Sequence, residues 1–337
     1  MGIRGWIKRA VALGIMLLGA SAQAQDNDRV WVESIETPAP VLGNVASAAS
    51  GTTVFTVSPS TGTVTKVSGN GYRVSNASTR ALVTVGCGGP GYCNNFEARI
   101  TVRSIGSPTG RAGQLTNFTV SPITATIVAP PSGTNPMTFT IGPIGRNSTK
   151  SFYVGMDFPI EGDSSGKPTG AATSAFEVQV ELIHTPFSGT RSGLATATVF
   201  RPITIGLTSN LAFGTVSRPF AGSGAISVDA ATGARSVSGA GVQAMNTPSA
   251  TRATYSANGE GGQVFSVSVP QTFAMNRAGG GSLTVTTSNT AAGTQILSGA
   301  MGSSGSYSFS VGGSFPVTEA TPLGNYSGAF AVMVQYN

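Results

Sequence analysis

Apolar and polar residues alternate along much of this chain with a period of two, which is the spacing of β-strands. Runs of this kind occupy residues 96–103, 176–182, 265–269, 283–285, 307–311 and 330–336. In the first run Phe96, Ala98 and Ile100 share one face, and polar or charged residues lie between them. One apolar and one polar face indicate strands of antiparallel sheets that bury a single side.

Clusters of Gly, Pro, Ser and Asn separate these runs and indicate turns. They lie at residues 68–71, 130–133, 278–281, 302–305 and 312–313. No window shows an apolar stripe of helical period bounded by capping residues, so we expect no long helix. Only 9% of residues are charged whereas 40% are hydrophobic, a balance that favours strands joined by tight turns.

An internal repeat divides the chain. Residues 41–45 (VLGNV) resemble residues 212–216 (AFGTV), and residues 60–62 (STG) resemble residues 231–233 (ATG) at the same offset of 171. Further along, residues 175–178 (AFEV) resemble residues 329–332 (AFAV). A repeat of this length indicates a duplicated domain, with chance likeness of short motifs as the alternative. We predict an all-β chain of two tandem antiparallel β-sandwich domains, immunoglobulin-like or pilin-like, over residues 25–200 and 201–337.

The first 24 residues have the pattern of a secretory signal peptide. Three basic residues precede an apolar run at 10–20, and Ala22-Gln23-Ala24 fits the cleavage rule. The run is short for a membrane span, and an uncleaved anchor is the alternative. Without this leader the chain has 16 basic and 13 acidic residues, a net charge of +3. Since no basic block occurs, we expect no nucleic-acid partner.

The two cysteines, Cys87 and Cys93, flank a short loop rich in glycine (CGGPGYC). In an exported protein such a close pair predicts a disulfide, whereas a metal site would need further ligands nearby. Closing so short a loop stabilises the fold by about 2–3 kcal/mol in the chain-entropy model.

Residues that could carry chemistry are few. The single histidine, His184, follows a predicted strand and is typical of a turn. Residues 162–166 (GDSSG) match G-x-S-x-G, but the strand before and the helix after that this motif needs are missing. Asp157, Glu161 and Asp163 share one predicted loop, where calcium binding is an open alternative to plain solvation. We therefore expect no enzyme activity, no cofactor and no catalytic or metal site.

A receptor site on the first domain would lie on loops at one of its ends. One candidate is the loop around Tyr92 inside the predicted disulfide ring, with Asn94 and Asn95 beside it, where an exposed ring could stack under a glycan. The other is the segment 130–135. Packing of Tyr92 over its own disulfide is the alternative.

Four short motifs lie in the second half of the chain. They are residues 211–216 (LAFGTV), 266–270 (SVSVP), 310–313 (SVGG) and 324–328 (GNYSG). On these motifs about 135 residues of the second half resemble a family of bacterial surface domains known as domain of unknown function 4402. The resemblance implies a β-fold and a surface location, but no reaction.

The C-terminus has a pattern of its own. Tyr336 is penultimate, Gly324 is the fourteenth residue from the end, and Phe330, Val332 and Val334 alternate between them. This end resembles fimbrial subunits that are assembled by a periplasmic chaperone and an outer-membrane usher. The resemblance implies a sandwich without its last strand, in which these five residues border an apolar groove. A chaperone and then a neighbouring subunit would fill it by strand addition; an ordinary last strand is the alternative.

Only residues 25–29 precede the first repeat unit in the expected mature chain, too few for a donor strand. This favours a tip position, with an outer binding domain joined at Arg201-Pro202 to a pilin-like domain. We therefore expect a secreted subunit that passes through the periplasm to the cell surface or a fimbria and acts in adhesion or surface assembly. A self-contained structural protein of the envelope or biofilm matrix is the alternative.

Overall fold

The computed structural model describes residues 30–75, 78–89 and 91–337. The expected signal peptide, its cleavage site and residues 25–29 lie outside the described residues. Two short helical turns, α1 (Tyr92–Asn95) and η1 (Asp163–Ser165), interrupt a chain that is otherwise strands and turns. The all-β fold class is confirmed. None of the helices in the described ranges is long and apolar enough to cross a membrane.

The first domain, as we call the part up to Phe200, has two sheets. Its strands are β1 (Val30–Ile35), β2 (Val41–Ala46), β3 (Thr52–Val57), β4 (Val64–Ser68), β5 (Tyr72–Arg73), β6 (Ala81–Cys87), β7 (Ala98–Thr109), β8 (Thr116–Pro122), β9 (Ile127–Ser132), β10 (Met137–Ile141), β11 (Ser148–Glu161), β12 (Gly170–Leu182) and β13 (Ser188–Phe200). One sheet has the order β1-β6-β11-β3-β4 with β8 beside β11, and the other has β5-β2-β13-β12-β7-β10-β9. Their apolar faces meet in one core, where Phe139 of β10 packs edge-on against Phe152 of β11.

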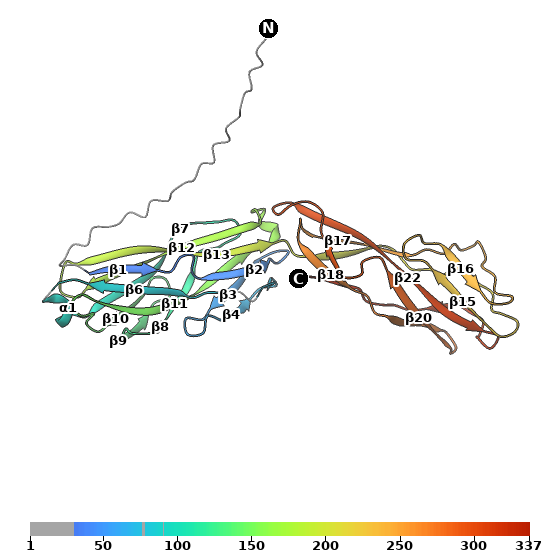
Figure 1. Cartoon of the computed structure of the whole chain (residues 1–337), viewed down its shortest axis with the longest axis horizontal. Helices are drawn as coiled ribbons and strands as arrows, with labels where there is room; N and C mark the ends of the chain where they lie inside the picture. Colours follow the sequence, from blue (N-terminus) through green and yellow to red (C-terminus); the bar gives the residue numbers. More distant parts are fainter. Residues whose placement is uncertain (1–29, 76–77, 90) are drawn as a thin grey trace, which may run out of the picture.

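The second domain begins after Phe200 and continues end to end with the first (Figure 1). Its strands are β14 (Thr204–Ser209), β15 (Ser223–Val228), β16 (Arg235–Ser238), β17 (Ala253–Glu260), β18 (Val264–Ser268), β19 (Thr272–Arg277), β20 (Ser282–Asn289), β21 (Thr294–Ile296), β22 (Ser304–Thr318), β23 (Tyr326–Ser327) and β24 (Met333–Tyr336). The large sheet follows β14-β17-β22-β20-β19-β23, with β15 and β16 attached to β22. A small sheet of β21-β18-β24 faces it.

The two domains repeat one strand order. In the first domain β11 pairs with β6, β3 and β8, and in the second β22 pairs with β17, β15 and β20. The strand β15 covers the residues of β3 shifted by 171 positions. Gly62 and Gly233, at the same shift, both have φ of 75°, which other residues rarely adopt. The repeat suggested by short motifs is therefore a repeat of backbone structure.

Two expected turns differ in the structure. Gly312 and Gly313 lie inside β22 and are buried. A Cβ added to Gly312 would lie 2.2 Å from the carbonyl oxygen of Val228 on β15. Glycine is thus required there by close backbone approach, not by a turn. The segment 130–135 is also not a loop throughout, since its first three residues belong to β9 and the turn begins at Gly133.

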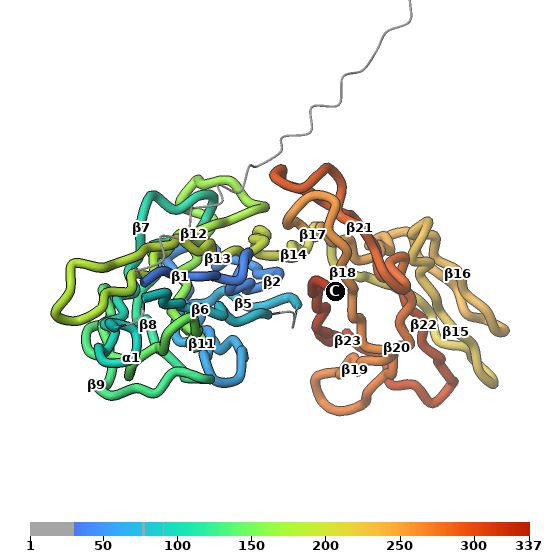
Figure 2. Tube along the Cα trace, turned by 60° about the vertical axis from the view of Figure 1, so that its left-hand side comes forward, coloured from blue at the N-terminus to red at the C-terminus, as the bar shows by residue number. Residues whose placement is uncertain are grey.

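The terminal strand is shorter than the alternation of residues 330–336 predicts. Only β24 pairs with β18, whereas residues 328–332 make no ladder. The alternation of burial nevertheless extends through the whole run, with Phe330, Val332, Val334 and Tyr336 turned inward. Figure 2 shows the C-terminus beside β18, at the end of the second domain that faces the first.

Candidate functional site: an open groove in the second domain

Residues 201–337 contain no counterpart of β13. In the first domain β13 lies between β12, with which it pairs antiparallel, and β2, with which it pairs in parallel. The segment 212–217 corresponds to β2, since its bridges from Ala212 to Thr251 and from Val216 to Ala244 repeat those of β2. The strand β24 corresponds to β12, because β24 pairs with β18 as β12 pairs with β7, and the residues of the two strands align at a shift of 154 positions. In residues 201–337, all of which are described, no strand lies between them.

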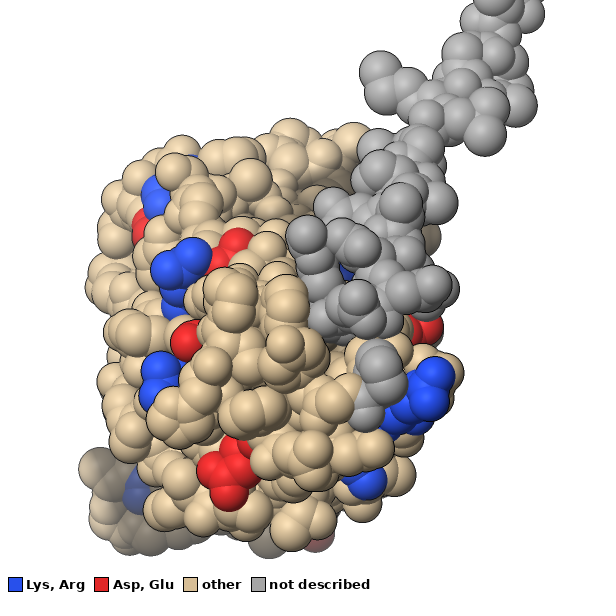
Figure 3. Space-filling model, turned by 90° about the vertical axis from the view of Figure 1, so that its left-hand side faces the viewer, with Lys and Arg blue, Asp and Glu red and all other residues tan. Residues whose placement is uncertain are grey.

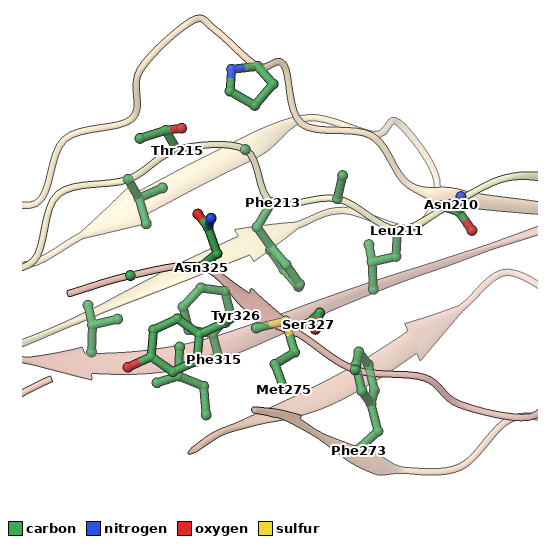
Figure 4. Close-up of a pocket in the computed structure, with 18 of the residues that line it drawn as sticks. Asn210, Leu211, Phe213, Thr215, Phe273, Met275, Phe315, Asn325, Tyr326 and Ser327 are labelled. Carbon is green, nitrogen blue, oxygen red and sulfur yellow. The ribbon is translucent and has the colours of Figure 1, made fainter. Parts of the chain in front are cut away.

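An apolar groove of about 820 Å³ occupies this place. Segment 210–218 forms one wall and segment 321–330 forms the other, and residues of β19, β20 and β22 form the floor. Figure 4 shows the side chains of Leu211, Phe213, Phe273, Met275 and Phe315 in the space between the two walls.

The missing strand leaves its neighbours less covered than their counterparts. Val45 is fully buried in the first domain, whereas its counterpart Val216 is only half-buried. Leu207 on β14 lines the groove and is 55% exposed. The edge strand β14 and the segment 321–330 that leads into β24 thus border an apolar channel. An extended peptide could pair with such an edge and bury alternate side chains in the channel.

The structure brings together most of the five residues expected at the partner-strand edge. Phe330 and Gly324 line the groove, and Val332 packs with Phe330 against the buried Phe309. Val334 pairs with Val267 across the small sheet. The role of these residues in binding a partner strand stays a prediction. Sequence reasoning missed the opposite wall, although the repeat at 212–216 marked it.

Two arginines bind the wall at 321–324, Arg218 from the opposite wall and Arg277 from β19. Arg218 Nη1 donates to the carbonyl oxygen of Thr321 at 3.0 Å, and Arg277 Nη1 donates to that of Leu323 at 3.4 Å. Gly324 has φ of 145° and lies against Arg277, so a side chain at this glycine would collide with the arginine. The groove is therefore held open by contacts within the domain.

Tyr336 connects the terminal strand to the joint between the domains. Its hydroxyl accepts a hydrogen bond from the backbone N–H of Glu260 at 2.7 Å and donates one to the carbonyl oxygen of Arg201 at 3.0 Å. The ring packs edge-on against Phe200 with ring centres 5.7 Å apart. Burial is the main cause that raises the pKa of Tyr336 to about 12.

The joint itself has a buried carboxylate that sequence reasoning did not find. Glu260 is fully buried and accepts hydrogen bonds from Thr169 Oγ1 at 2.8 Å and from the backbone N–H groups of Arg201 at 3.1 Å and Gly302 at 2.5 Å. Since Thr169 belongs to the first domain, this carboxylate ties the two domains together. A buried carboxylate requires several donors of this kind.

The carboxylates expected as a possible calcium site do not converge. Asp157 accepts from Thr56 and Asn117, Glu161 pairs with Lys167, and Asp163 pairs with Arg111 and Arg201. Each is thus engaged by side chains of its own neighbourhood. Within the described ranges no three His, Cys, Asp or Glu residues are grouped as a metal site.

Ser164 and His184 lie far apart. Ser164 is in η1 before β12, and His184 is in the turn after it, so the thirteen residues of β12 separate them by about 40 Å. His184 has φ of 66°, a left-handed turn conformation. The structure therefore does not join these two residues into one site.

The disulfide between Cys87 and Cys93 is confirmed, with the two Cα atoms 5.7 Å apart. It holds α1 at the end of the first domain that points away from the second (Figure 1). Tyr92 is 43% exposed and packs against Phe96 and Phe187. Figure 3 shows that charged side chains on this end are scattered and of both signs where the surface is described.

Comparison with known proteins identifies the second half. A family model described as Domain of unknown function (DUF4402) matches residues 203–336. The resemblance of the second half to this family is thereby confirmed. No curated protein matches the sequence.

Two solved structures with fimbrial components are similar to this chain. One is from a chaperone–tip adhesin complex of CFA/I fimbriae biogenesis, at 10% identity over 74% of this chain and 85% of that chain, with a TM-score of 0.22. The other is from a chaperone–tip subunit pre-assembly complex of the archaic chaperone–usher Csu pili of Acinetobacter baumannii. It is 9% identical over 90% of this chain and 99% of that chain, with a TM-score of 0.25.

Proposed function

We propose that this chain is a fimbria-like surface subunit that is completed by a strand of another polypeptide and acts in adhesion or surface assembly. The observation that carries the proposal is the absence, in residues 201–337, of a counterpart of β13 between β24 and segment 212–217. The first domain contains that strand, so it shows what the second domain would be when complete.

The first domain also indicates the chemistry of the missing strand. The inward residues of β13 are apolar, with Ala195, Ala197 and Val199 almost fully buried, and polar residues alternate with them. Its partner in the second domain would be an extended segment of the same alternation, antiparallel to β24 and parallel to segment 212–217. In a fimbrial pathway a periplasmic chaperone would supply it first, and a neighbouring subunit would supply it after passage through the outer-membrane usher.

A test uses the full chain and a version that fills its own groove. At a shift of 154 positions the inward residues of β12 match those of the terminal run. They are Phe176, Val178, Val180 and Leu182 in β12, and Phe330, Val332, Val334 and Tyr336 at the C-terminus. A copy of residues 184–200 appended after Asn337 would therefore continue the second domain as the first domain continues from β12 into β13. A matched control carries the same extension with its copies of Ala195, Ala197 and Val199 replaced by asparagine.

Both versions and the unextended chain would be tagged, exported to the periplasm of the native host and purified. We expect the unextended chain and the control to retain a periplasmic chaperone, identified by mass spectrometry, and the self-filled version to lose it and unfold at a higher temperature. An unextended chain that purifies without a partner and shows one sharp unfolding transition would refute the proposal. That outcome would leave a self-contained envelope or matrix protein.

The first domain would carry the adhesive part of this function. Its outer end has the partly exposed ring of Tyr92, held by the disulfide and by Phe187, which suits contact with a glycan or another surface receptor. Replacing Tyr92 by alanine would weaken adhesion of assembled subunits without changing chaperone retention. Unchanged adhesion in that variant would place the receptor site elsewhere.

A further inference from the structure

The far end of the second domain repeats the joint by which the first domain holds the second. The shift of 171 positions that relates the two domains makes Met245 the counterpart of Val74. A shift of 154 positions aligns β12 with the terminal strand and makes Leu323 the counterpart of Thr169. Val74 packs into the apolar cluster of the joint, and Thr169 donates to Glu260 of the second domain. Thr169 therefore bonds to the domain that follows β13, and Val74 belongs to an apolar cluster that this domain shares.

Their counterparts are exposed. Met245 is 51% exposed and Leu323 is 71% exposed, and Phe220 nearby is 81% exposed. Phe220 lies against Gly241, and Met245 donates its N–H to the carbonyl oxygen of Thr215. We call Phe220, Met245 and Leu323 the far-end surface.

These residues lie at the opposite end of the domain from the joint. The strand β22 starts next to Gly302, whose N–H donates to Glu260 in the joint, and runs for fifteen residues to Thr318. Its far end is thus about 45 Å from the joint. Thr318, at the end of β22, pairs there with Ser223, at the start of β15. The chain that leaves β22 toward Leu323 and the chain that enters β15 from Phe220 therefore lie side by side.

The direction of the missing strand points to the same end. The strand β24 runs toward the joint, because its last residue, Tyr336, bonds to Arg201. A strand antiparallel to β24 runs from the joint to the far end, and the chain that follows it emerges there. In the first domain the corresponding chain after β13 enters the next sandwich domain within three residues.

We infer that the far-end surface binds the folded domain that follows the complementing strand, so that one partner occupies the groove and this surface together. This inference rests on the proposed function, because the groove must be filled by a strand with a domain behind it. The partner is a β-sandwich subunit that presents a small apolar patch at the base of its N-terminal strand, as the second domain presents Phe265 and Leu297 to the first. Continuity with the joint inside the chain makes such a domain a better fit than a free peptide.

Photo-cross-linking in the full chain tests this arrangement. A photoreactive amino acid would replace Leu207 in the groove, Phe220 or Met245 on the far-end surface, or Val67 as a control. Val67 is 62% exposed on the edge strand β4 of the first domain and belongs to neither site. The variants would be expressed in the native host and irradiated in the cell-surface fraction, which separates assembled subunits from periplasmic complexes.

The expected result is that all three site positions cross-link to the same polypeptide. The groove position would attach to its N-terminal segment and the far-end positions to the folded domain behind that segment, whereas Val67 would give no adduct with it. A partner found from Leu207 but not from Phe220 or Met245 would overturn the inference and leave the proposed function standing. No partner strand at Leu207 would refute the proposed function, and the inference with it.

A second measurement does not depend on adduct formation. Phe220→Asn and Met245→Asn together should lower the recovery of the partner with the tagged chain about tenfold, which corresponds to the loss of about 1.4 kcal/mol of binding free energy. Chaperone retention should not change, since the groove is untouched. Full recovery of the partner in this double variant would also overturn the inference.

Discussion

Replacing Tyr336 by phenylalanine removes a single oxygen atom from the joint. The hydroxyl of Tyr336 connects the N–H of Glu260 with the carbonyl oxygen of Arg201, at 2.7 and 3.0 Å, and the residue is only 6% exposed. The phenylalanine ring keeps the packing against Phe200. The perturbation is thus confined to two hydrogen bonds.

The magnitude follows from the two backbone groups that lose their partner. A buried polar group left without a hydrogen bond costs about 1–3 kcal/mol. With partial access of water at the joint we expect a total loss of about 2–4 kcal/mol. For a domain of this size the unfolding temperature of the second domain should fall by about 10 °C.

Differential scanning calorimetry of the full chain measures this effect. Tyr326→Phe is a matched control, because its hydroxyl donates a hydrogen bond of 2.7 Å to the carbonyl oxygen of Pro322 in an exposed place. Loss of that exposed bond should cost less than about 1 kcal/mol. Equal unfolding temperatures of the two variants would refute the view that Tyr336 holds the joint. Faster proteolysis at Arg201-Pro202 in Tyr336→Phe alone would support it.

Three further outcomes are expected. Because burial raises the folded-state pKa of Tyr336 from 10 to about 12, the stability that depends on its protonated hydroxyl is complete below pH 10 and declines as the pH rises toward 12. Urea unfolding across this range should show a steeper decline in the natural chain than in Tyr336→Phe, which keeps only the decline from Tyr72 and Tyr255, whose pKa values burial also raises. Replacing Cys87 and Cys93 together by alanine should cost about 2–3 kcal/mol and lower the unfolding temperature of the first domain, while an unchanged first transition would contradict a stabilising disulfide. Gly193→Ala should lower the free energy of unfolding by about 1–3 kcal/mol, because its Cβ would lie 2.4 Å from the ring of Phe176 on β12. In Gly206→Ala the added Cβ has no neighbour closer than 4.0 Å, so the same urea titration should show a nearly neutral change.

The strands of this protein could be predicted because their information is local. Alternation placed β7, β12 and the first half of β22, with inward residues such as Phe176 and Phe309 buried as expected. Gly312 and Gly313 were predicted as a turn for the same reason, since a glycine pair has the same local meaning wherever it occurs. Only the approach of Val228 from another strand shows that these glycines serve close packing.

The groove was partly predictable. The pattern at Phe330, Val332 and Val334 indicated an edge, and the structure places Phe330 beside the apolar floor of the groove. The wall at 212–216 and the buried Glu260 were not predicted as parts of a site. Their roles depend on residues more than thirty positions away, such as Thr169 and Tyr336.

The sequence by itself determined the all-β class, the duplicated unit and the disulfide pair, because strand period, repeated motifs and cysteine spacing act over short distances along the chain. The resemblance of the C-terminus predicted a second sandwich without its last strand, but only the tertiary structure shows that residues 201–337 place no strand between β24 and segment 212–217. Whether a sandwich is complete depends on which strand lies between two others, and β13 joins β2 and β12 across more than a hundred residues. The absence of such a strand beside β24 leaves no mark in the local pattern of β24, since an edge strand and a central strand can have the same alternation.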